Sequence, residues 1–152
     1  MNLTEHFKLI EFTRSNTAIK YGIKNEPNAE QIANLRALCE NVLEPLRQHF
    51  NVPIVISSGF RCPAVNFHKE VRGITNSQHM TGEAADIHIP DTATGNEWFE
   101  WMMDNLQYDQ LIKERATPTS KSFWIHVSFK RNVSCGQTSK NRQQVKYITK
   151  NP

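Results

Sequence analysis

The chain has 152 residues, of which 38% are hydrophobic and 22% charged, and this composition predicts one folded domain over residues 1–152 rather than a disordered segment. The net charge of +3 is too small to indicate a nucleic-acid partner, and no basic stripe interleaved with aromatic residues appears. No apolar run approaches the ~20 residues of a membrane-spanning helix. The three cysteines are an odd number without a C-x-x-C pair, so they do not predict a disulfide framework.

The first part of the chain predicts helices. Residues 3–12 are expected to form a short opening helix capped by Thr4, and the segment Arg14–Gly22 a connection. Asn28 is a good N-cap for the next helix. The apolar residues of that helix recur at helical spacing, and they are Ile32, Leu35, Leu38, Val42 and Leu46. Pro45 lies within this pattern, so we expect a kink there.

The remainder predicts strands interrupted by helices. Pro63 suits the first position of a short helix through Val71, and T-G-N-E at 94–97 is a capping box for a helix through about Leu106. The expected strands, the first of them buried, are 53–57, 84–89, 108–114, 123–129 and 144–148. Adjacent strands suggest hairpins, so we expect an α+β fold with a small, mostly antiparallel sheet packed by helices.

Candidate ligands for a metal occur on two of these strands. In residues 84–89 the side chains alternate, so Asp86 shares a face with His88, and a buried carboxylate is costly unless it is paired or bound to a metal. Gly82 permits a sharp turn that would bring His79 back beside Asp86. On the strand 123–129, His126 points away from the apolar face.

Two imidazoles and one carboxylate with an open fourth position would form a catalytic zinc site. His88 is the main rival ligand, and each histidine taken alone is also typical of a hydrogen-bonded or surface residue. The same donors form the facial triad of non-haem iron oxygenases. Those enzymes usually sit on a many-stranded jelly roll, and this chain has too few predicted strands for one.

A combined motif carries a family resemblance. The pattern S-x-H-x-x-G-x-A-x-D at 77–86, followed by W-x-H at 124–126, resembles the zinc D-Ala-D-Ala carboxypeptidase family. Its relatives include phage peptidoglycan endolysins and vancomycin-resistance D,D-dipeptidases, and the Hedgehog signalling domain shares the fold. The segment S-S-G-F-R-C-P at 57–63 looks like the S-G-[YF]-R-S-P element of the family, and the resemblance covers roughly residues 3–130.

The resemblance implies roles for particular residues. By position, His79, Asp86 and His126 would bind zinc, and Arg61 matches the arginine that faces the substrate and the developing oxyanion. That role agrees with the physical need, because a fixed guanidinium stabilises the negative charge that hydrolysis places on the carbonyl oxygen. Ser77 and Gln78 are expected to hydrogen-bond the substrate or the groups that hold the metal ligands.

The general base departs from the family pattern. Many members carry an acid three residues before the last histidine ligand, where this chain has Phe123. The nearest upstream acids are Glu114 and Asp109, on opposite faces of the preceding strand. Across a hairpin Glu114 could reach the attacking water, so we expect it rather than Asp109 to be the base.

The resemblance implies a zinc peptidase that hydrolyses D-amino-acid-containing bonds in the stem peptides of peptidoglycan, as a carboxypeptidase or as an endopeptidase. The alternative is a non-catalytic, zinc-bearing wall-binding module of the same fold, which the phenylalanine at 123 favours. The start of the chain lacks the charged-then-apolar shape of a signal peptide. We therefore expect synthesis in the cytoplasm and action on the wall after release or as part of a phage particle.

Overall fold

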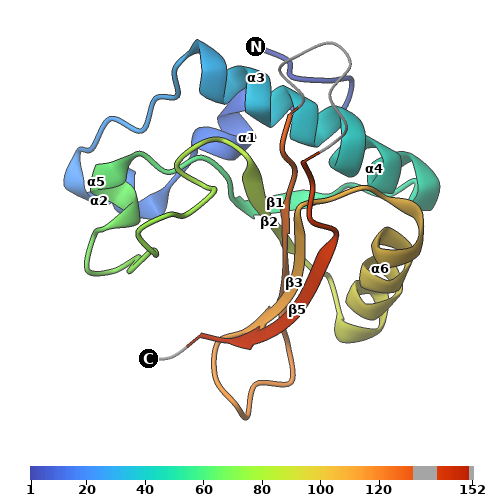
Figure 1. Cartoon of the computed structure of the whole chain (residues 1–152). Coiled ribbons are helices and arrows are strands. Elements are labelled where there is room, and N and C mark those ends of the chain that lie inside the picture. Colours follow the sequence, from blue (N-terminus) through green and yellow to red (C-terminus); the bar gives the residue numbers. More distant parts are fainter. Residues whose placement is uncertain (132–139, 151–152) are drawn as a thin grey trace.

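Five strands form one mixed sheet in the computed structural model, which describes residues 1–131 and 140–150 (Figure 1). The strands are β1 (Val55–Ser58), β2 (Ala84–His88), β3 (Gln110–Arg115), β4 (Trp124–Ser128) and β5 (Gln144–Thr149). Their order is β1-β2-β4-β3-β5, and every pairing is antiparallel except that of β3 with β5. This confirms the predicted α+β fold with a mostly antiparallel sheet.

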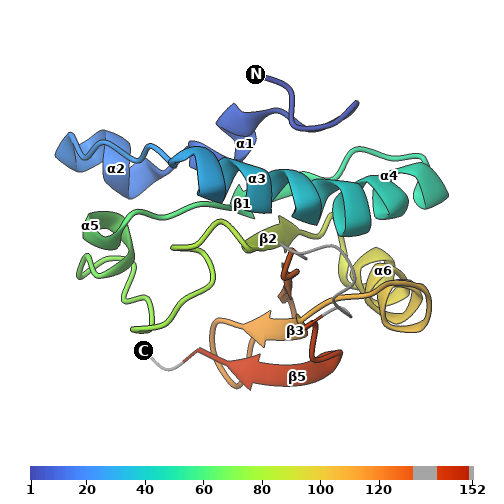
Figure 2. The same cartoon turned by 45° about the horizontal axis from the view of Figure 1, so that its top comes forward.

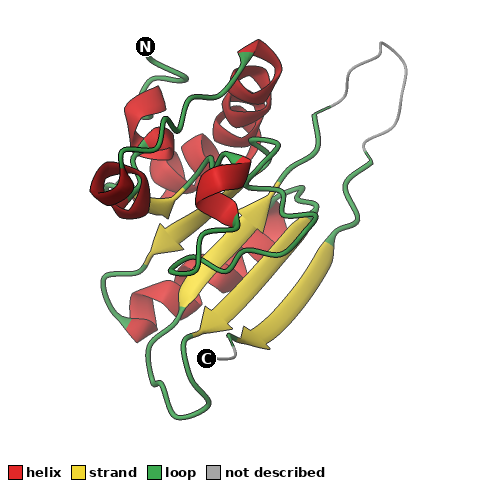
Figure 3. Ribbon diagram, turned by 90° about the vertical axis from the view of Figure 1, so that its left-hand side faces the viewer, coloured by secondary structure: helices red, strands yellow, loops and turns green. Residues whose placement is uncertain are grey.

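Helices lie on both sides of this sheet. Helix α6 (Thr92–Asn105) covers one face, whereas α5 (Pro63–Asn66) and the loop that leads into β2 pass in front of the other (Figure 3). The helices α3 (Ala29–Leu38) and α4 (Glu44–Phe50) run as one rod beside β1 (Figure 2). In the described part of the chain no helix combines the length and the apolar character that crossing a membrane requires.

The N-terminal prediction is partly wrong. The first helix, α1 (Leu9–Thr13), begins after a turn in which the Leu3 N–H donates to the Phe7 carbonyl, so Thr4 caps nothing. Leu3 and Phe7 are both buried, which pulls this turn into the core and keeps it from continuing as a helix. The expected connection contains a second short helix, α2 (Asn16–Tyr21).

The cap at Asn28 is confirmed. Its side-chain oxygen accepts a hydrogen bond from the Gln31 N–H at 2.9 Å, and the Gln31 side chain accepts one from the Asn28 N–H. The irregularity expected near Pro45 takes the form of a π-helical turn, η1 (Cys39–Leu43). There the Glu44 N–H donates to the Cys39 carbonyl, one residue further back than in an α-helix, just before the proline that has no N–H of its own.

Other element boundaries differ from the sequence prediction. Strand β1 is an edge strand whose Val55 is 53% exposed, so it is not buried as expected. Helix α6 begins before residues 94–97, because Asp91 is its cap and accepts a hydrogen bond from the Thr94 N–H at 2.7 Å. Helix α5 ends at Asn66, well short of Val71.

The hydrophobic core lies between the apolar face of the sheet and the helices. Residues of α3, η1, α4 and α6 pack there with Ile87 of β2 and with the alternate side chains of the strand region 123–129, which are Phe123, Ile125, Val127 and Phe129. The opposite face of β2 and β4 carries Asp86 and His126, which are cross-strand partners. Cys39 and Cys62 are free thiols, and Cys135 lies outside the described residues.

Helix α3 holds the turn that precedes β2. The Gln31 side chain donates to the Met80 carbonyl at 3.0 Å, and the Asn34 side chain donates to the Thr81 carbonyl at 2.9 Å. Gly82 has a φ of 75°, and a Cβ at this position would lie 2.5 Å from the Gln31 carbonyl oxygen. A glycine is therefore required both by the backbone conformation and by the close approach of the helix.

We expect Gly82→Ala to lower the free energy of unfolding more than Gly22→Ala does. Both glycines have a positive φ, 75° at Gly82 and 64° at Gly22. An alanine in this left-handed conformation destabilises the fold by roughly 1–2 kcal/mol at either position. Nothing lies within 4 Å of a Cβ at Gly22, whereas at Gly82 the clash with α3 adds about 1–3 kcal/mol. Urea unfolding of the chelator-treated variants measures the difference, and equal losses would contradict the close approach of α3.

Candidate metal centre

Three potential metal ligands meet at the polar face of the sheet. Asp86 of β2 and His126 of β4 are direct cross-strand partners, and His79 comes from the loop before β2. The Asp86 Oδ1 lies 2.9 Å from His126 Nδ1 and 3.4 Å from His79 Nε2. One potential ligand atom from each residue lies within 4.8 Å of those of the other two, which is close enough for all three to hold one ion.

The imidazole of His79 is oriented from behind by the segment after β1. Its Nδ1 lies 2.7 Å from the Gly59 carbonyl oxygen, which can only accept, so Nδ1 carries the proton and Nε2 is free to face Asp86. The Arg61 N–H donates to the His79 carbonyl at 3.1 Å. A Cβ on Gly59 would lie 2.6 Å from the Phe12 Cα, so only glycine lets α1 approach this carbonyl.

Burial and charge favour the protonation states that bind metals. His79 is 2% exposed, and this burial lowers the pKa of its imidazole, which keeps the ring neutral. Burial alone would raise the pKa of Asp86, but the two neighbouring imidazoles hold the pKa of this carboxyl well below its ordinary value. A neutral imidazole and an ionised carboxylate are the forms that coordinate a cation.

The rival ligand lies elsewhere. His88 is exposed at the end of β2, where it pairs with Val55 on the edge strand, and it is not a member of the three-residue cluster. Two imidazole nitrogens and one carboxylate oxygen fit zinc with a further position open for water or substrate. They would also fit iron, but the sheet has five strands and is not the jelly roll of the iron oxygenases.

Glu114 lies on the same face of the sheet as the cluster. It pairs with Trp124, two residues before His126 on β4, and its Oε1 lies 3.9 Å from His126 Nδ1. Burial, and next the charge of Asp86, raise the pKa of Glu114. A carboxyl group in this position can exchange a proton with a water beside the cluster.

Asp109 occupies a different environment. It is fully buried, and its carboxylate accepts two hydrogen bonds from the Arg142 side chain, at 3.0 and 2.7 Å, and one from the Gln78 side chain at 2.9 Å. Burial alone would raise the pKa of Asp109, but the hydrogen bonds, above all those of Arg142, lower it. The oxygens of Asp109 are thus engaged in holding two other segments, which leaves Glu114 as the acid nearest the cluster.

A cavity of about 530 Å³ in front of the cluster also contains the predicted substrate-facing residues. Arg61, Ser77 and Gln78 line it together with Glu114. Ser77 Oγ accepts a hydrogen bond from the His79 N–H at 3.3 Å. Among the described residues, the buried Arg61 Nε and Gln78 Oε1 have no hydrogen-bond partner. An unpaired donor and an unpaired acceptor therefore belong to residues in the wall of this cavity.

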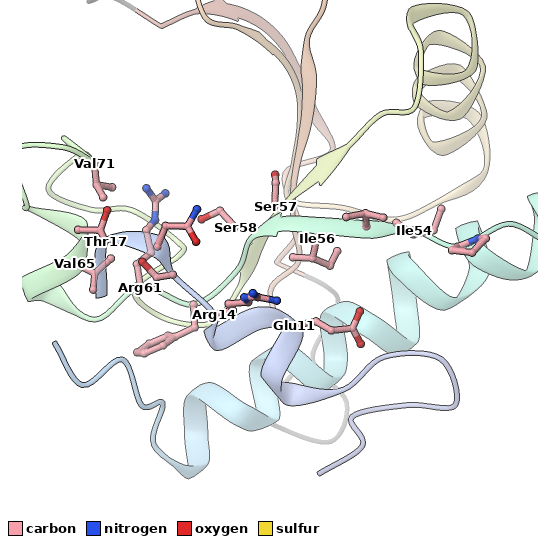
Figure 4. Close-up of a pocket in the computed structure, with 15 residues that line it drawn as sticks. Glu11, Arg14, Thr17, Ile54, Ile56, Ser57, Ser58, Arg61, Val65 and Val71 are labelled. Atoms are coloured by element: carbon pink, nitrogen blue, oxygen red, sulfur yellow. The ribbon is translucent and has the colours of Figure 1, made fainter. Parts of the chain in front are cut away.

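A second cavity, of about 510 Å³, lies beyond Arg61 and runs along β1 (Figure 4). Arg61, Val65 and Val71 are at one end of it, and Glu11 and Ile54 lie toward the other. Arg61 lines both cavities, so it stands at the boundary between the metal cluster and the exposed edge of the sheet.

Sequence reasoning missed some of the residues that build the site. The Gly59 carbonyl that orients His79 and the Arg142 side chain that neutralises Asp109 were not predicted. The glycine of the S-S-G-F-R-C-P segment was a visible signal for a close backbone approach. Nothing local in the sequence around Arg142 indicated its partner.

Comparison with known proteins identifies a family for the chain. A search of curated proteins found no match to the chain. A family model described as Peptidase M15 matches residues 5–128, which span all three potential ligands, Arg61 and Glu114. This match confirms the resemblance to the zinc D-Ala-D-Ala carboxypeptidase type. The chain belongs to the Peptidase M15 family, and this membership implies a hydrolase that cuts peptide bonds.

Proposed function

We propose that the chain is a zinc-dependent peptidase that hydrolyses D-amino-acid-containing peptide bonds in the stem peptides of peptidoglycan. The observation that carries the proposal is the cluster of His79, Asp86 and His126, whose potential ligand atoms lie within 4.8 Å of one another in a chain of a peptidase family. Both a D,D-carboxypeptidase and an endopeptidase of the endolysin type are compatible with it. The place of action would be the cell wall, reached after release from the cell or as part of a phage particle.

In this proposal each side chain of the site has one task. His79, Asp86 and His126 would hold the zinc, which when bound supplies Lewis-acid polarisation of the scissile carbonyl and of the attacking water. Glu114 would accept a proton from that water and return it to the leaving amine. Its position 3.9 Å from His126 supports this role.

Arg61 and Gln78 would handle the substrate. The Arg61 guanidinium would donate to the oxygen on which negative charge develops, and its place in the cavity beside the three potential ligands supports this role. Gln78 is held by Asp109 through its nitrogen, so its unpaired Oε1 would accept from a substrate N–H. Ser77 accepts a hydrogen bond from the backbone of His79, which supports a role in positioning that ligand rather than a direct contact with substrate.

A second candidate function keeps the metal without turnover. Phe123, which stands where many relatives carry their acid, has no ionisable group and is buried in the core. This observation favours a wall-binding module that retains the zinc for stability. The two candidates differ in whether Glu114 replaces the missing acid.

We expect the purified protein to bind one zinc ion per chain and His126→Ala to lose it. His88→Ala is the matched control, because His88 is exposed and outside the cluster, and it should retain the ion. Elemental analysis after dialysis measures the stoichiometry, and far-UV circular dichroism checks that both variants fold. Retention of zinc by His126→Ala, or its loss from His88→Ala, would show that the ligand set is wrong.

We expect the zinc-loaded protein to release D-alanine from a peptide ending in D-Ala-D-Ala, or to cut a cross-linked peptide dimer. A chelator should abolish the reaction and added zinc should restore it, because the ligands found here suit that ion. Mass spectrometry of the products identifies the scissile bond. Binding of wall fragments by the zinc-loaded protein without any product would instead support the non-catalytic module.

We expect Glu114→Gln to lower kcat by roughly 10²–10⁴-fold, the usual contribution of a general base, while zinc content stays at one per chain. Glu100→Gln on α6 is the control, since Glu100 is exposed on the helix that covers the other face of the sheet. Steady-state kinetics on the peptide that the wild type cleaves gives both values. Full activity of the Glu114→Gln variant with bound zinc would rule out this residue as the base.

A further inference from the structure

The last strand adds to the site from outside the region that defines the family. The family match ends at residue 128, whereas β5 spans Gln144–Thr149 and pairs in parallel with β3, the strand that carries Glu114. In the two cartoon views β5 lies beside β3 at the outer edge of the sheet (Figures 1 and 2). It is anchored at both ends, where the Gln144 N–H donates to the Asp109 carbonyl at 3.0 Å and the Lys150 N–H donates to the Arg115 carbonyl at 2.7 Å.

The register of the sheet puts Lys146 in line with the metal cluster. Asp86 pairs with His126, His126 with Ile112, and Ile112 with Lys146, so these four residues form one row across the sheet. Lys146 is two strand spacings from His126, or about 10 Å between backbones. An extended peptide advances roughly 3.3 Å per residue, so this span equals about three residues of substrate.

Side-chain alternation directs Lys146 to the cavity. Tyr147, the next residue, is on the opposite face of β5, where its ring lies 5.7 Å from that of Phe99 on α6. Lys146 and Ile148 therefore share the face of Glu114, and both line the cavity in front of the metal cluster. Lys150 lines the same cavity, and its Nζ lies 3.4 Å from the Val71 carbonyl on the opposing loop.

The outer wall of the cavity carries two lysine side chains, Lys146 and Lys150. Among the residues that the structure describes, neither Lys146 nor Lys150 has a carboxylate within ion-pair distance. Arg142 is different, because Asp109 neutralises it at 2.7 Å. The acids of the cavity, Asp86 and Glu114, lie at the centre beside the histidines. A bound peptide would therefore meet positive charge on the β5 side of the site.

We propose that Lys146, assisted by Lys150, forms a subsite for a second free carboxylate of the substrate. This carboxylate lies two to three residues from the scissile bond, or at the same distance along a side chain. This inference rests on the proposed peptidase function and names the substrate class. The terminal carboxylate of a D-Ala-D-Ala peptide is about one residue from the scissile bond, so it is too close to reach Lys146. The subsite favours stem peptides in which the diamino-acid or glutamyl residue has a free carboxylate. It disfavours stem peptides in which this carboxylate has been converted to an amide.

The experiment compares two synthetic stem peptides that differ only in this group, a free carboxylate in one and a carboxamide in the other. We expect the wild type to prefer the carboxylate peptide by about fivefold in kcat/KM, as befits one partly screened ion pair. Lys146→Gln should reduce the ratio to about one, and Lys146→Arg should restore it. Lys24→Gln, an exposed lysine outside the cavity, should keep the wild-type ratio. The preference should also shrink as salt is added.

Failure of the subsite and failure of the proposed function give different results. Equal hydrolysis of both peptides by the wild type, or a preference that survives Lys146→Gln, would overturn the subsite and leave the peptidase intact. Should neither peptide be cut, calorimetric titration of each into the zinc-loaded protein decides. Tighter binding of the carboxylate peptide, lost in Lys146→Gln, supports the subsite, and equal binding refutes it.

Discussion

The carboxylate of Asp86 is the constraint on which the rest of the site depends. A charge this close to the core is costly unless a hydrogen-bond donor or a cation compensates it, and here His126 Nδ1 lies 2.9 Å and His79 Nε2 3.4 Å from the Asp86 Oδ1. The two imidazoles are positioned in different ways. The register of β2 with β4 sets His126 opposite Asp86, whereas the turn at Gly82 returns His79 to it. The apolar face of the same strands fixes that register, since a slip by one residue would exchange the two faces.

Strand alternation explains why the centre of the site could be predicted from the sequence. Residues 84–89 and 123–129 alternate in polarity, and a period of two assigns Asp86 and His126 to the polar side without knowledge of the fold. Caps and prolines likewise mark local events, as Asn28 did. The start of α6 was predicted too late. The capping box at 94–97 was expected to open this helix, whereas Asp91 caps it three residues earlier.

Contacts between distant segments could not be predicted in this way. Whether β1 is buried depends on which strand lies beyond it, and its place at the edge of the sheet leaves Val55 exposed despite its apolar sequence. The orientation of His79 depends on the Gly59 carbonyl, twenty residues earlier in the chain. The position of that carbonyl depends in turn on the close contact between Gly59 and Phe12 of α1. In each case the deciding partner is set by tertiary packing, which neither propensity nor periodicity encodes.

Asp109 shows how one buried charge can serve the site without entering the chemistry. Its carboxylate joins Gln78, beside the ligand His79, to Arg142, just before β5. Loss of either partner would leave a buried charge partly uncompensated, so the two segments stabilise each other through it. The strand that extends the cavity beyond the family region is thus tied to the loop that carries a metal ligand. Its register with β3 then places Lys146 on the face of the sheet that carries Glu114. The strand that carries the proposed subsite and the loop that carries His79 therefore share one buried carboxylate.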